Sequence, residues 1–415
     1  MSMVVVDKYK KVPLLTKLLI SMVIGIILGA VFGESVVIIR PLGTVFLNLL
    51  KMAALPLIVV NLISGISALD DPKLFGKIGI KIMLYYFFTT FIAIVLGLVL
   101  GTIIKPGVGF VLQGSYEQTI ETIPSFGDTI IGLIPSNIFE ALSNGKFDQI
   151  VVFSAFIGIT MLFLNKKDRD ILKTGVDSLA NLFNKLVGII MGYAPIGICA
   201  LMACTVGTYG AQLGGFLAKY LGASYLCVFA QLIVYSILLL TFGKRNPLWF
   251  FKKASPLIVT ALSTSSSLAC VPVGIECADN MKIPRSISGF TIPLGSQVNK
   301  DGNGMMLAIT FLFAAQAIGA PITLDMMIKA ILISLILTTG AGGVPGGGIV
   351  TIAIVIDAFG LPLEVVGIIS GIFALIDMVY TMMNCLGDLV GTYIVAYVER
   401  DHIKWVEDSS NDIEM

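Results

Sequence analysis

The chain has 415 residues, of which 56% are hydrophobic and only 13% are charged, and its mean hydropathy is +0.95. Soluble domains carry about 25% charged residues, so this composition excludes an ordinary soluble protein and indicates an integral membrane protein. A net charge of +1 leaves no basic footprint for nucleic acid, and no nucleic-acid partner is expected. The expected surroundings of the chain are a lipid bilayer.

Six apolar runs in the first part of the sequence are predicted to be spanning helices, which need about 20 residues each. They cover residues 14–32, 45–66, 78–104, 150–164, 176–202 and 225–242. The first run lacks a small-residue cleavage site followed by a soluble domain, so it is interpreted as a helix and not as a signal peptide. Lys and Arg gather at the N-terminus and at residues 166–173 and 244–253, which by the positive-inside rule places both termini in the cytoplasm.

Two apolar stretches in the second part are each interrupted at their middle by small and polar residues. Residues 256–284 are divided by the serine-rich run 263–267, and residues 324–361 by the glycine-rich run 338–348. The limbs that remain are shorter than the about 20 residues that a spanning helix needs. The pattern therefore predicts two re-entrant hairpins, which enter the membrane from opposite faces.

Each predicted hairpin is followed by a long apolar segment with Asn and Asp inside it: Asn299 and Asp301 in the first, Asn384 and Asp388 in the second. An ionised group at mid-membrane costs about 2.5–3.5 kcal/mol on insertion scales, so such groups usually serve transport. Irregular backbone is tolerated there only inside protein or beside a wet cavity, which favours two broken helices. A hairpin followed by a broken helix, repeated in the opposite orientation, is the inverted repeat of many secondary transporters.

A polar stripe runs along the last apolar segment. Its members lie 3, 4, 7 and 11 residues after Asp377, so they share one face of a helix. Hydrogen bonding between helices would explain one threonine or one asparagine, but it does not explain two carboxylates. We predict that the stripe faces a substrate cavity, and its members are Asp377, Tyr380, Thr381, Asn384 and Asp388.

Four segments together resemble the dicarboxylate/amino acid:cation symporter family, which includes glutamate and neutral amino acid transporters. They are the serine run 263–267, NKDGN at 299–303, GGVPGGG at 342–348 and DMVYTMMNCLGDLVGT at 377–392. The resemblance covers nearly the whole chain. It implies an all-α integral membrane protein with about eight transmembrane helices, two re-entrant hairpins and inverted repeats, which works as an elevator-type transporter and forms a homotrimer.

The resemblance also implies a scaffold that forms the trimer and a transport domain that moves. Scaffold helices one and two lie in residues 1–77, and helices four and five in residues 105–213. Helix three, at residues 78–104, belongs to the transport domain. Residues 214–399 supply helix six, hairpin one, broken helix seven, hairpin two and broken helix eight, and residues 400–415 form a cytoplasmic tail.

By the same resemblance, Asp377 holds the ammonium group of an amino acid, and the hairpin tips hold its carboxylate. The implied substrate-binding residues are Thr264, Ser265, Ser266, Asn303, Val344, Gly348, Asp377, Tyr380, Thr381 and Asn384. The implied sodium ligands are Tyr86, Thr89, Thr90, Gly295, Gln297, Asn299, Asp301, Thr338, Thr339, Ala341, Asn384 and Asp388. Hard oxygen ligands suit an alkali cation. No cofactor is expected, and Na⁺ is the expected coupling ion.

The sequence departs from the family pattern at positions that bear on substrate and ion. Family members that read acidic substrates have an arginine at the position of Tyr380 and another at that of Thr264 or Met378, and all three are uncharged here. Sodium-coupled members read NMDGT where this chain reads NKDGN. Lys300 either turns to a carbonyl or to water, or it neutralises Asp301 or its neighbours as a tethered cation that partly replaces sodium. At about 4 Å and an effective dielectric of 20, such a pair is worth roughly 4 kcal/mol before desolvation.

These residues predict a secondary active symporter in the plasma membrane that carries a small neutral amino acid, of the serine, threonine or alanine type, with a cation that we expect to be sodium. An enzyme is not expected, because the sequence shows no Ser/His/Asp, metal-ligand or phosphate-loop constellation. One alternative is a symporter for an acidic amino acid or a C4-dicarboxylate. Another is a sodium-independent or proton-coupled carrier because of Lys300, and a third is a channel or anion-conducting pore.

Overall fold

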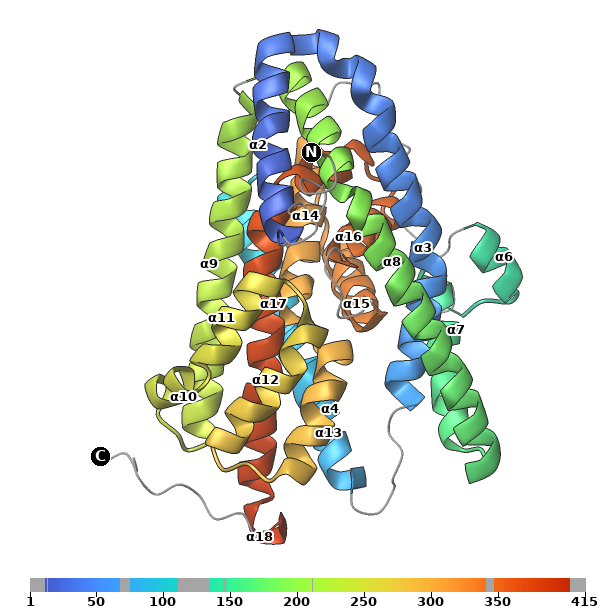
Figure 1. Cartoon of the computed structure of the whole chain (residues 1–415), viewed down its shortest axis with the longest axis vertical. Helices are drawn as coiled ribbons and strands as arrows, with labels where there is room; N and C mark the ends of the chain where they lie inside the picture. The colour runs from blue at the N-terminus through green and yellow to red at the C-terminus, as the bar shows by residue number, and fades with distance from the viewer. Residues whose placement is uncertain are drawn as a thin grey trace, which may run out of the picture.

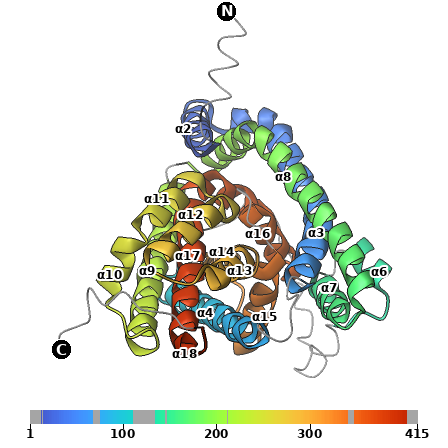
Figure 2. The same ribbon diagram turned by 60° about the horizontal axis from the view of Figure 1, so that its bottom comes forward.

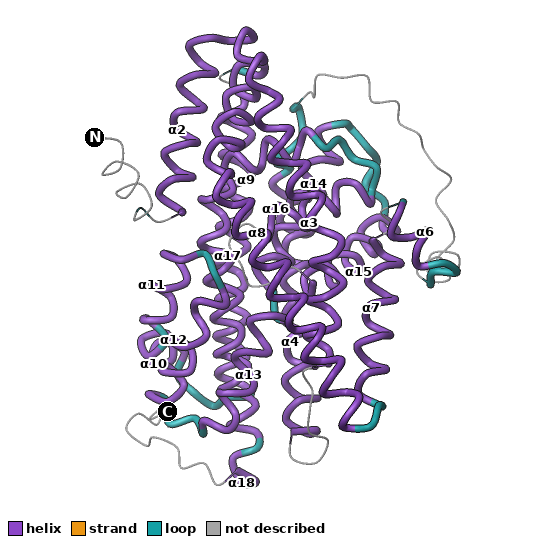
Figure 3. Tube along the Cα trace, turned by 45° about the vertical axis from the view of Figure 1, so that its right-hand side comes forward, coloured by secondary structure: helices purple, strands orange, loops and turns teal. Residues whose placement is uncertain are grey.

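The structure is a computed structural model of the chain, and it describes residues 12, 14–67, 75–110, 134–144, 147–210, 212–340 and 347–403. Every regular element in these ranges is a helix, so the prediction of an all-α protein is confirmed (Figure 3). Five of the described segments are long and apolar enough to cross a membrane. They are Thr16–Leu49, Ile78–Ile104, Lys166–Tyr209, Leu213–Thr241 and Glu364–Val398.

Six helices occupy the six apolar runs that were predicted to span the membrane. They are α2 (Leu14–Phe32), α3 (Arg40–Ser67), α4 (Phe75–Ile104), α7 (Phe147–Leu162), α8 (Lys166–Tyr209) and α9 (Gln212–Thr241). The short helix η1 (Gly33–Ile39) joins α2 to α3, and α6 (Ile138–Ser143) precedes α7. Most of residues 105–134 lies outside the described part of the chain.

Helices α2, α3, α7 and α8 form an arc along one side of the other helices, as Figure 2 shows. Within the arc, α8 packs along both α2 and α3. Glycines on α2 permit the close approach of α8: a Cβ on Gly29 would lie 2.5 Å from the Ala203 carbonyl oxygen, and one on Gly25 would lie 2.6 Å from that of Cys199. Small residues that let two backbones meet are typical of helix contacts in membranes.

The two predicted hairpins are two pairs of short helices. In the first pair, α11 (Ser255–Thr264) packs against α12 (Ser267–Asn280) after the short helix α10 (Pro247–Lys253) (Figure 1). α11 ends because Ser265 has left-handed backbone angles, with φ 49° and ψ 36°. The Ser266 side chain then caps α12 by accepting the Ala269 N–H at 3.3 Å. The second pair is α15 (Leu324–Gly340) and α16 (Gly347–Ala358), and its tip lies outside the described residues.

The helix break predicted near Asn299 is confirmed. α13 (Arg285–Val298) and α14 (Asp301–Ala317) are separated by two residues with extended or irregular backbone. Asn299 has φ −85° and ψ 111°, and Lys300 has φ −136° and ψ 54°. The chain therefore interrupts its helix where an asparagine, a lysine and an aspartate follow one another.

The break predicted in the last apolar segment is wrong, because α17 (Glu364–Val398) is one continuous helix of 35 residues, followed by α18 (Arg400–Ile403). Its polar side chains find partners on neighbouring helices. Asn384 Oδ1 accepts the Gly302 N–H at 2.8 Å, and Asp388 Oδ1 accepts a side-chain N–H of Asn299 at 3.0 Å. Buried polar groups that are satisfied in this way do not compete for the backbone hydrogen bonds of α17.

Candidate functional site

The break before α14 lies where several helices meet, since α14 packs against α4, α9 and α17. Gly302, in the first turn of α14, makes the contact with α17 possible. A Cβ on Gly302 would lie 2.2 Å from the Tyr380 carbonyl oxygen. Only a residue without a side chain lets the two backbones come this close. Polar side chains of four helices are therefore brought to one region.

Asp301 is fully buried and accepts hydrogen bonds from residues of two helices. We call Asp301 and these donors the Asp301 group. From α4, the Thr90 hydroxyl donates at 2.6 Å and the Thr89 hydroxyl at 3.3 Å. From α9, the Tyr235 hydroxyl donates at 2.5 Å and the Gln231 amide at 3.4 Å. The sequence analysis included the threonines but missed both α9 residues. Their signal was available, because they are polar and four residues apart in an apolar run.

The Asp388 group consists of Gly295, Asn299, Asn384 and Asp388. The Asn299 side-chain amide donates to Asp388 Oδ1 at 3.0 Å and to the Asn384 carbonyl at 3.4 Å. Asp388 lies over α13, where a Cβ on Gly295 would be 2.4 Å from Oδ1. A cavity of about 10 Å³, which is room for one water molecule, touches Asp388 beside α12. The structure brings together all four residues that were predicted to form one sodium site.

Tyr86 was expected to lie with Asp301, but it lies with the Asp388 group. Its hydroxyl donates to the Thr291 carbonyl at 2.8 Å and would be 2.6 Å from a Cβ on Gly295. Thr90 links the two groups, because its hydroxyl lies 3.5 Å from Asn299 Oδ1. The described residues include no group of three or more His, Cys, Asp or Glu side chains that could hold a metal ion. The oxygens of the two groups are the hard ligands that alkali cations prefer.

The third predicted ion site lies partly outside the described residues. Gln297 is half-buried near the end of α13. Thr338 is buried near the end of α15, and its hydroxyl donates to the Leu335 carbonyl at 2.9 Å. Ala341 and the side chain of Thr339 are not among the described residues. This site stays a prediction.

The polar face of α17 meets the start of α14 at the predicted substrate residues. The Asn384 side-chain amide donates to Asn303 Oδ1 at 3.4 Å. Thr381 is buried about one turn before Asn384, and Asp377 is half-buried a further turn along the same face. Together, this face and the start of α14 offer one carboxylate, one hydroxyl and two amides, which are groups that can bind the ammonium and carboxylate of an amino acid.

The structure describes the tip of the first hairpin but not that of the second. Thr264, Ser265 and Ser266 lie at the tip of the first hairpin, where α12 begins. Free N–H groups at a helix N-terminus favour an anion, such as a substrate carboxylate. In the second hairpin Gly348 is buried at the start of α16, and Val344 lies outside the described residues.

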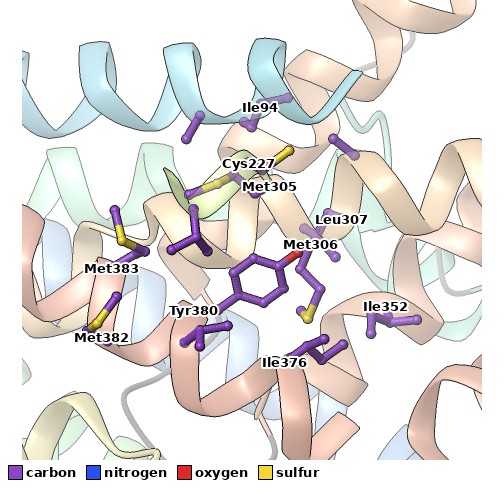
Figure 4. Packing of buried hydrophobic residues seen from close by; sticks show 14 of the residues in the cluster. Ile94, Cys227, Met305, Met306, Leu307, Ile352, Ile376, Tyr380, Met382 and Met383 are labelled. Atoms are coloured by element: carbon purple, nitrogen blue, oxygen red, sulfur yellow. The ribbon is translucent and has the colours of Figure 1, made fainter. Parts of the chain in front are cut away.

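Tyr380 does not lie on the polar face with Asp377. Its side chain is fully buried, and Figure 4 shows the ring among Met305, Met306 and Ile376. At 3.6 residues per turn, a residue three positions after Asp377 is rotated by about 60° from it, and this rotation turns Tyr380 toward α14. A direct contact between Tyr380 and substrate stays a prediction, and it requires the ring to leave this packing.

Lys300 is buried in the gap between α13 and α14, with 1% of its surface exposed. Its ammonium donates to the Ser296 carbonyl. Asp388 and Asp377 are the carboxylates close enough to act on this ammonium. The structure thus shows the contact with a carbonyl that one interpretation of Lys300 expects. It also shows the nearby carboxylates that a tethered cation requires.

A second, larger cavity lies away from these groups, between the arc and the helices α16 and α17. Its volume is about 660 Å³. Arg40 and Thr44 of α3, Thr208 of α8, and Ala353 and Gly367 on the other side are among its lining residues. The arc and the remaining helices are thus incompletely packed against each other along this boundary.

Long apolar helices, two helical hairpins and buried carboxylates at a broken helix define this protein as a membrane transporter. The sequence profile of the Sodium:dicarboxylate symporter family matches residues 14–398, so the chain belongs to this family. It is therefore a cation-coupled symporter and not an enzyme, as the sequence predicted.

Three similar proteins illustrate the range of relatives. The proton/sodium-glutamate symport protein of Geobacillus stearothermophilus is 30% identical over 400 residues, which are 93% of this chain and 94% of that protein. The proton/glutamate-aspartate symporter of Escherichia coli (strain K12) is 30% identical over 407 residues, 93% of each chain. A C4-dicarboxylate transport protein of Citrifermentans bemidjiense is 29% identical over 398 residues, 93% of this chain and 90% of that protein. These names support a symporter, but they give no support to a neutral substrate.

Proposed function

We propose that this protein carries a small neutral amino acid, of the serine, threonine or alanine type, in symport with sodium. The observation that carries the cation coupling is the charge of the buried site. Asp301, Asp377 and Asp388 lie in the helices around the break, and Lys300 is the ammonium among them. Uncompensated negative charge at membrane depth is costly. A cation that binds with the substrate, and the ammonium of the substrate itself, offset this charge.

The substrate class follows from the residues around Asp377. The carboxylate suits the ammonium of an amino acid, and the N-terminus of α12 suits its carboxylate group. A second carboxylate on the substrate would need a cationic partner. The positions at which acidic-substrate members have arginine are Thr264, Met378 and Tyr380 here. A buried carboxylate without such a partner costs several kcal/mol even after relaxation, on the order seen for buried ions.

The proposed cation sites are formed by the oxygens of the Asp301 and Asp388 groups, with a third site between Gln297 and the end of α15. We place the scaffold in residues 1–77 and 105–213 and the transport domain in residues 78–104 and 214–399. The tight packing of α8 along α2 and α3 supports a rigid scaffold, and the cavity of about 660 Å³ at its boundary with α16 and α17 supports movement between the two parts. The proposed assembly is a homotrimer in the plasma membrane, with both termini in the cytoplasm and an elevator motion.

A second candidate is symport of an acidic amino acid or a C4-dicarboxylate, with protons or sodium. The names of the relatives favour it, since they include glutamate, aspartate and C4-dicarboxylate. In this case Lys300, which lies near Asp377, would be the cation closest to the substrate. The 30% identity leaves room for either substrate, so the substrate has to be measured.

One transport screen separates these candidates. Purified protein in proteoliposomes would be tested for uptake of each of the twenty amino acids and of succinate, with an inward gradient of sodium, with a proton gradient, and with neither. The proposal predicts saturable, sodium-driven accumulation of serine, threonine or alanine. Accumulation of aspartate or succinate in their place would establish the second candidate. Flux that does not saturate and never exceeds equilibrium would indicate a channel.

A further inference from the structure

The ammonium of Lys300 has a fixed place in the helix break. The residue is 1% exposed, and its ammonium donates to the Ser296 carbonyl one turn earlier in the chain. A buried ammonium that donates one hydrogen bond to a neutral carbonyl needs a counter-charge nearby if it is to stay charged. The charge of Lys300 therefore depends on the carboxylates that lie around the break between α13 and α14.

The counter-charge comes first from Asp388. Asp388 and Asp377 are both close enough to act on the Lys300 ammonium, and of these two it is Asp388 that has a contact on α13. The two contacts on α13 are neighbours in sequence, because Asp388 lies over Gly295 and Lys300 binds the carbonyl of Ser296. The lysine and the aspartate thus reach the same turn of α13, one from the break itself and one from α17.

The Asp301 group is different. Its described donors are the neutral hydroxyls of Thr89, Thr90 and Tyr235 and the neutral amide of Gln231. A carboxylate with neutral donors still needs a cation to balance its charge, whereas a carboxylate beside an ammonium has its balance already. A sodium ion added beside Asp388 would also be repelled by the ammonium, because the two charges have the same sign.

We propose that Lys300 is a built-in cation that replaces a coupling sodium ion at the Asp388 group, so that this group works without bound sodium while the Asp301 group binds it. The inference rests on the proposed sodium coupling. This chain reads NKDGN where sodium-coupled members read NMDGT. The inference attributes the difference in sodium binding to the lysine in this segment. Removing the charge opens the Asp388 group to an additional sodium ion.

The test measures sodium binding without any substrate. The unfolding temperature of the purified full-length protein would be recorded as sodium chloride replaces choline chloride at constant ionic strength. Each ion that binds only the folded protein adds a stabilisation that grows with the logarithm of its concentration. The variant Lys300→Met is expected to show a steeper rise with sodium than the wild type, by the contribution of one ion. Its affinity for that ion should exceed that of the wild-type Asp388 group by about tenfold or more, as expected when a nearby like charge is removed.

Three further variants keep the test decisive. Lys300→Arg keeps the charge and should follow the wild type. Lys300→Gln keeps a donor for the Ser296 carbonyl but removes the charge, so it should follow Lys300→Met and replaces it if that variant does not fold. Lys329→Met removes a lysine of α15 that pairs with Asp325 at 3.1 Å, outside the site, and should leave the sodium response unchanged.

Sodium titrations of Lys300→Met and Lys300→Gln that superimpose on the wild type would overturn the inference, even if sodium-driven uptake is observed. Conversely, the absence of uptake for every amino acid and for succinate would overturn the proposed function and leave the sodium titration interpretable.

The interaction between Lys300 and Asp388 can also be tested directly. Asp388→Asn should lower the unfolding temperature in the wild type, where it leaves the ammonium without its partner, and should lower it less in Lys300→Met. Equal losses in both backgrounds would show that Lys300 and Asp388 do not interact.

Discussion

The backbone N–H of Gly302 donates to the side-chain oxygen of Asn384 at 2.8 Å, and this bond joins the first turn of α14 to the middle of α17. The contact places Asn384, a member of the Asp388 group, directly beside Gly302, the residue that follows Asp301. Both proposed ion groups and the proposed substrate face therefore depend on how closely α14 approaches α17. A change at this junction should affect ion and substrate binding together.

Gly302→Ala tests the junction. The added Cβ would lie 2.2 Å from the Tyr380 carbonyl oxygen, so α14 has to move away from α17. Overpacking of a close contact costs about 1–3 kcal/mol. We expect a lower unfolding temperature and loss of uptake. Gly289→Ala is the matched control on α13, because a Cβ there meets nothing within 4 Å, and it should behave like the wild type. A Gly302→Ala variant with normal stability and uptake would contradict the close approach.

Tyr235→Phe tests the donor to Asp301 that the sequence analysis missed. The change removes the hydroxyl that donates to the carboxylate at 2.5 Å. Hydrogen bonds to charged groups are worth about 1.5–3 kcal/mol, so the protein should be less stable and should need more sodium for half-maximal stabilisation. The control is Tyr225→Phe, which loses a bond to the Leu375 carbonyl elsewhere on α9. Identical sodium titrations for both variants would remove Tyr235 from the ion site.

Asp377→Asn tests the amino acid hypothesis. The amide keeps the size of the side chain but removes the charge that pairs with a substrate ammonium, and such a loss costs about 2–5 kcal/mol. We expect a folded protein whose amino acid uptake falls by about 30-fold or more. Asp325→Asn removes a carboxylate that pairs with Lys329 on α15 and should retain uptake. Normal uptake by Asp377→Asn would exclude Asp377 as the ammonium ligand.

The sequence predicted the helices, the hairpins and the break at Asn299, because apolar runs and the small polar residues that interrupt them are local features. It could not predict that α17 is continuous. That outcome depends on Asn384 and Asp388 finding partners on α14 and at Asn299, which are distant in sequence. Helical spacing placed Tyr380 in the polar stripe with Asp377, but the ring packs away from that stripe, against α14, and this packing depends on residues distant in sequence.

The placement of Tyr380 leads to a prediction about substrate size. A phenol that lined the pocket would restrict it to small substrates. The ring is buried among Met305, Met306 and Ile376, so it takes no volume from the proposed site (Figure 4). Leucine is therefore expected to compete with serine for the site as an inhibitor, although the proposed transported substrates are smaller, and Tyr380→Phe should leave this inhibition unchanged. Strong inhibition by alanine without any by leucine would indicate that the ring turns into the pocket when substrate binds.

Tyr380→Arg tests how substrate charge is selected. An arginine cannot stay among the apolar neighbours of Tyr380, because a buried guanidinium without a partner costs several kcal/mol. A long side chain at this position can extend to the face of α17 that carries Asp377 and Thr381. There its charge would pair with the second carboxylate of an acidic substrate. We expect aspartate to become a competitor of serine uptake in the variant, although it is not one in the wild type, while Tyr380→Phe keeps the wild-type preference. A folded Tyr380→Arg protein that still ignores aspartate would show that position 380 does not reach the substrate, and tight aspartate binding by the wild type would refute the neutral substrate itself.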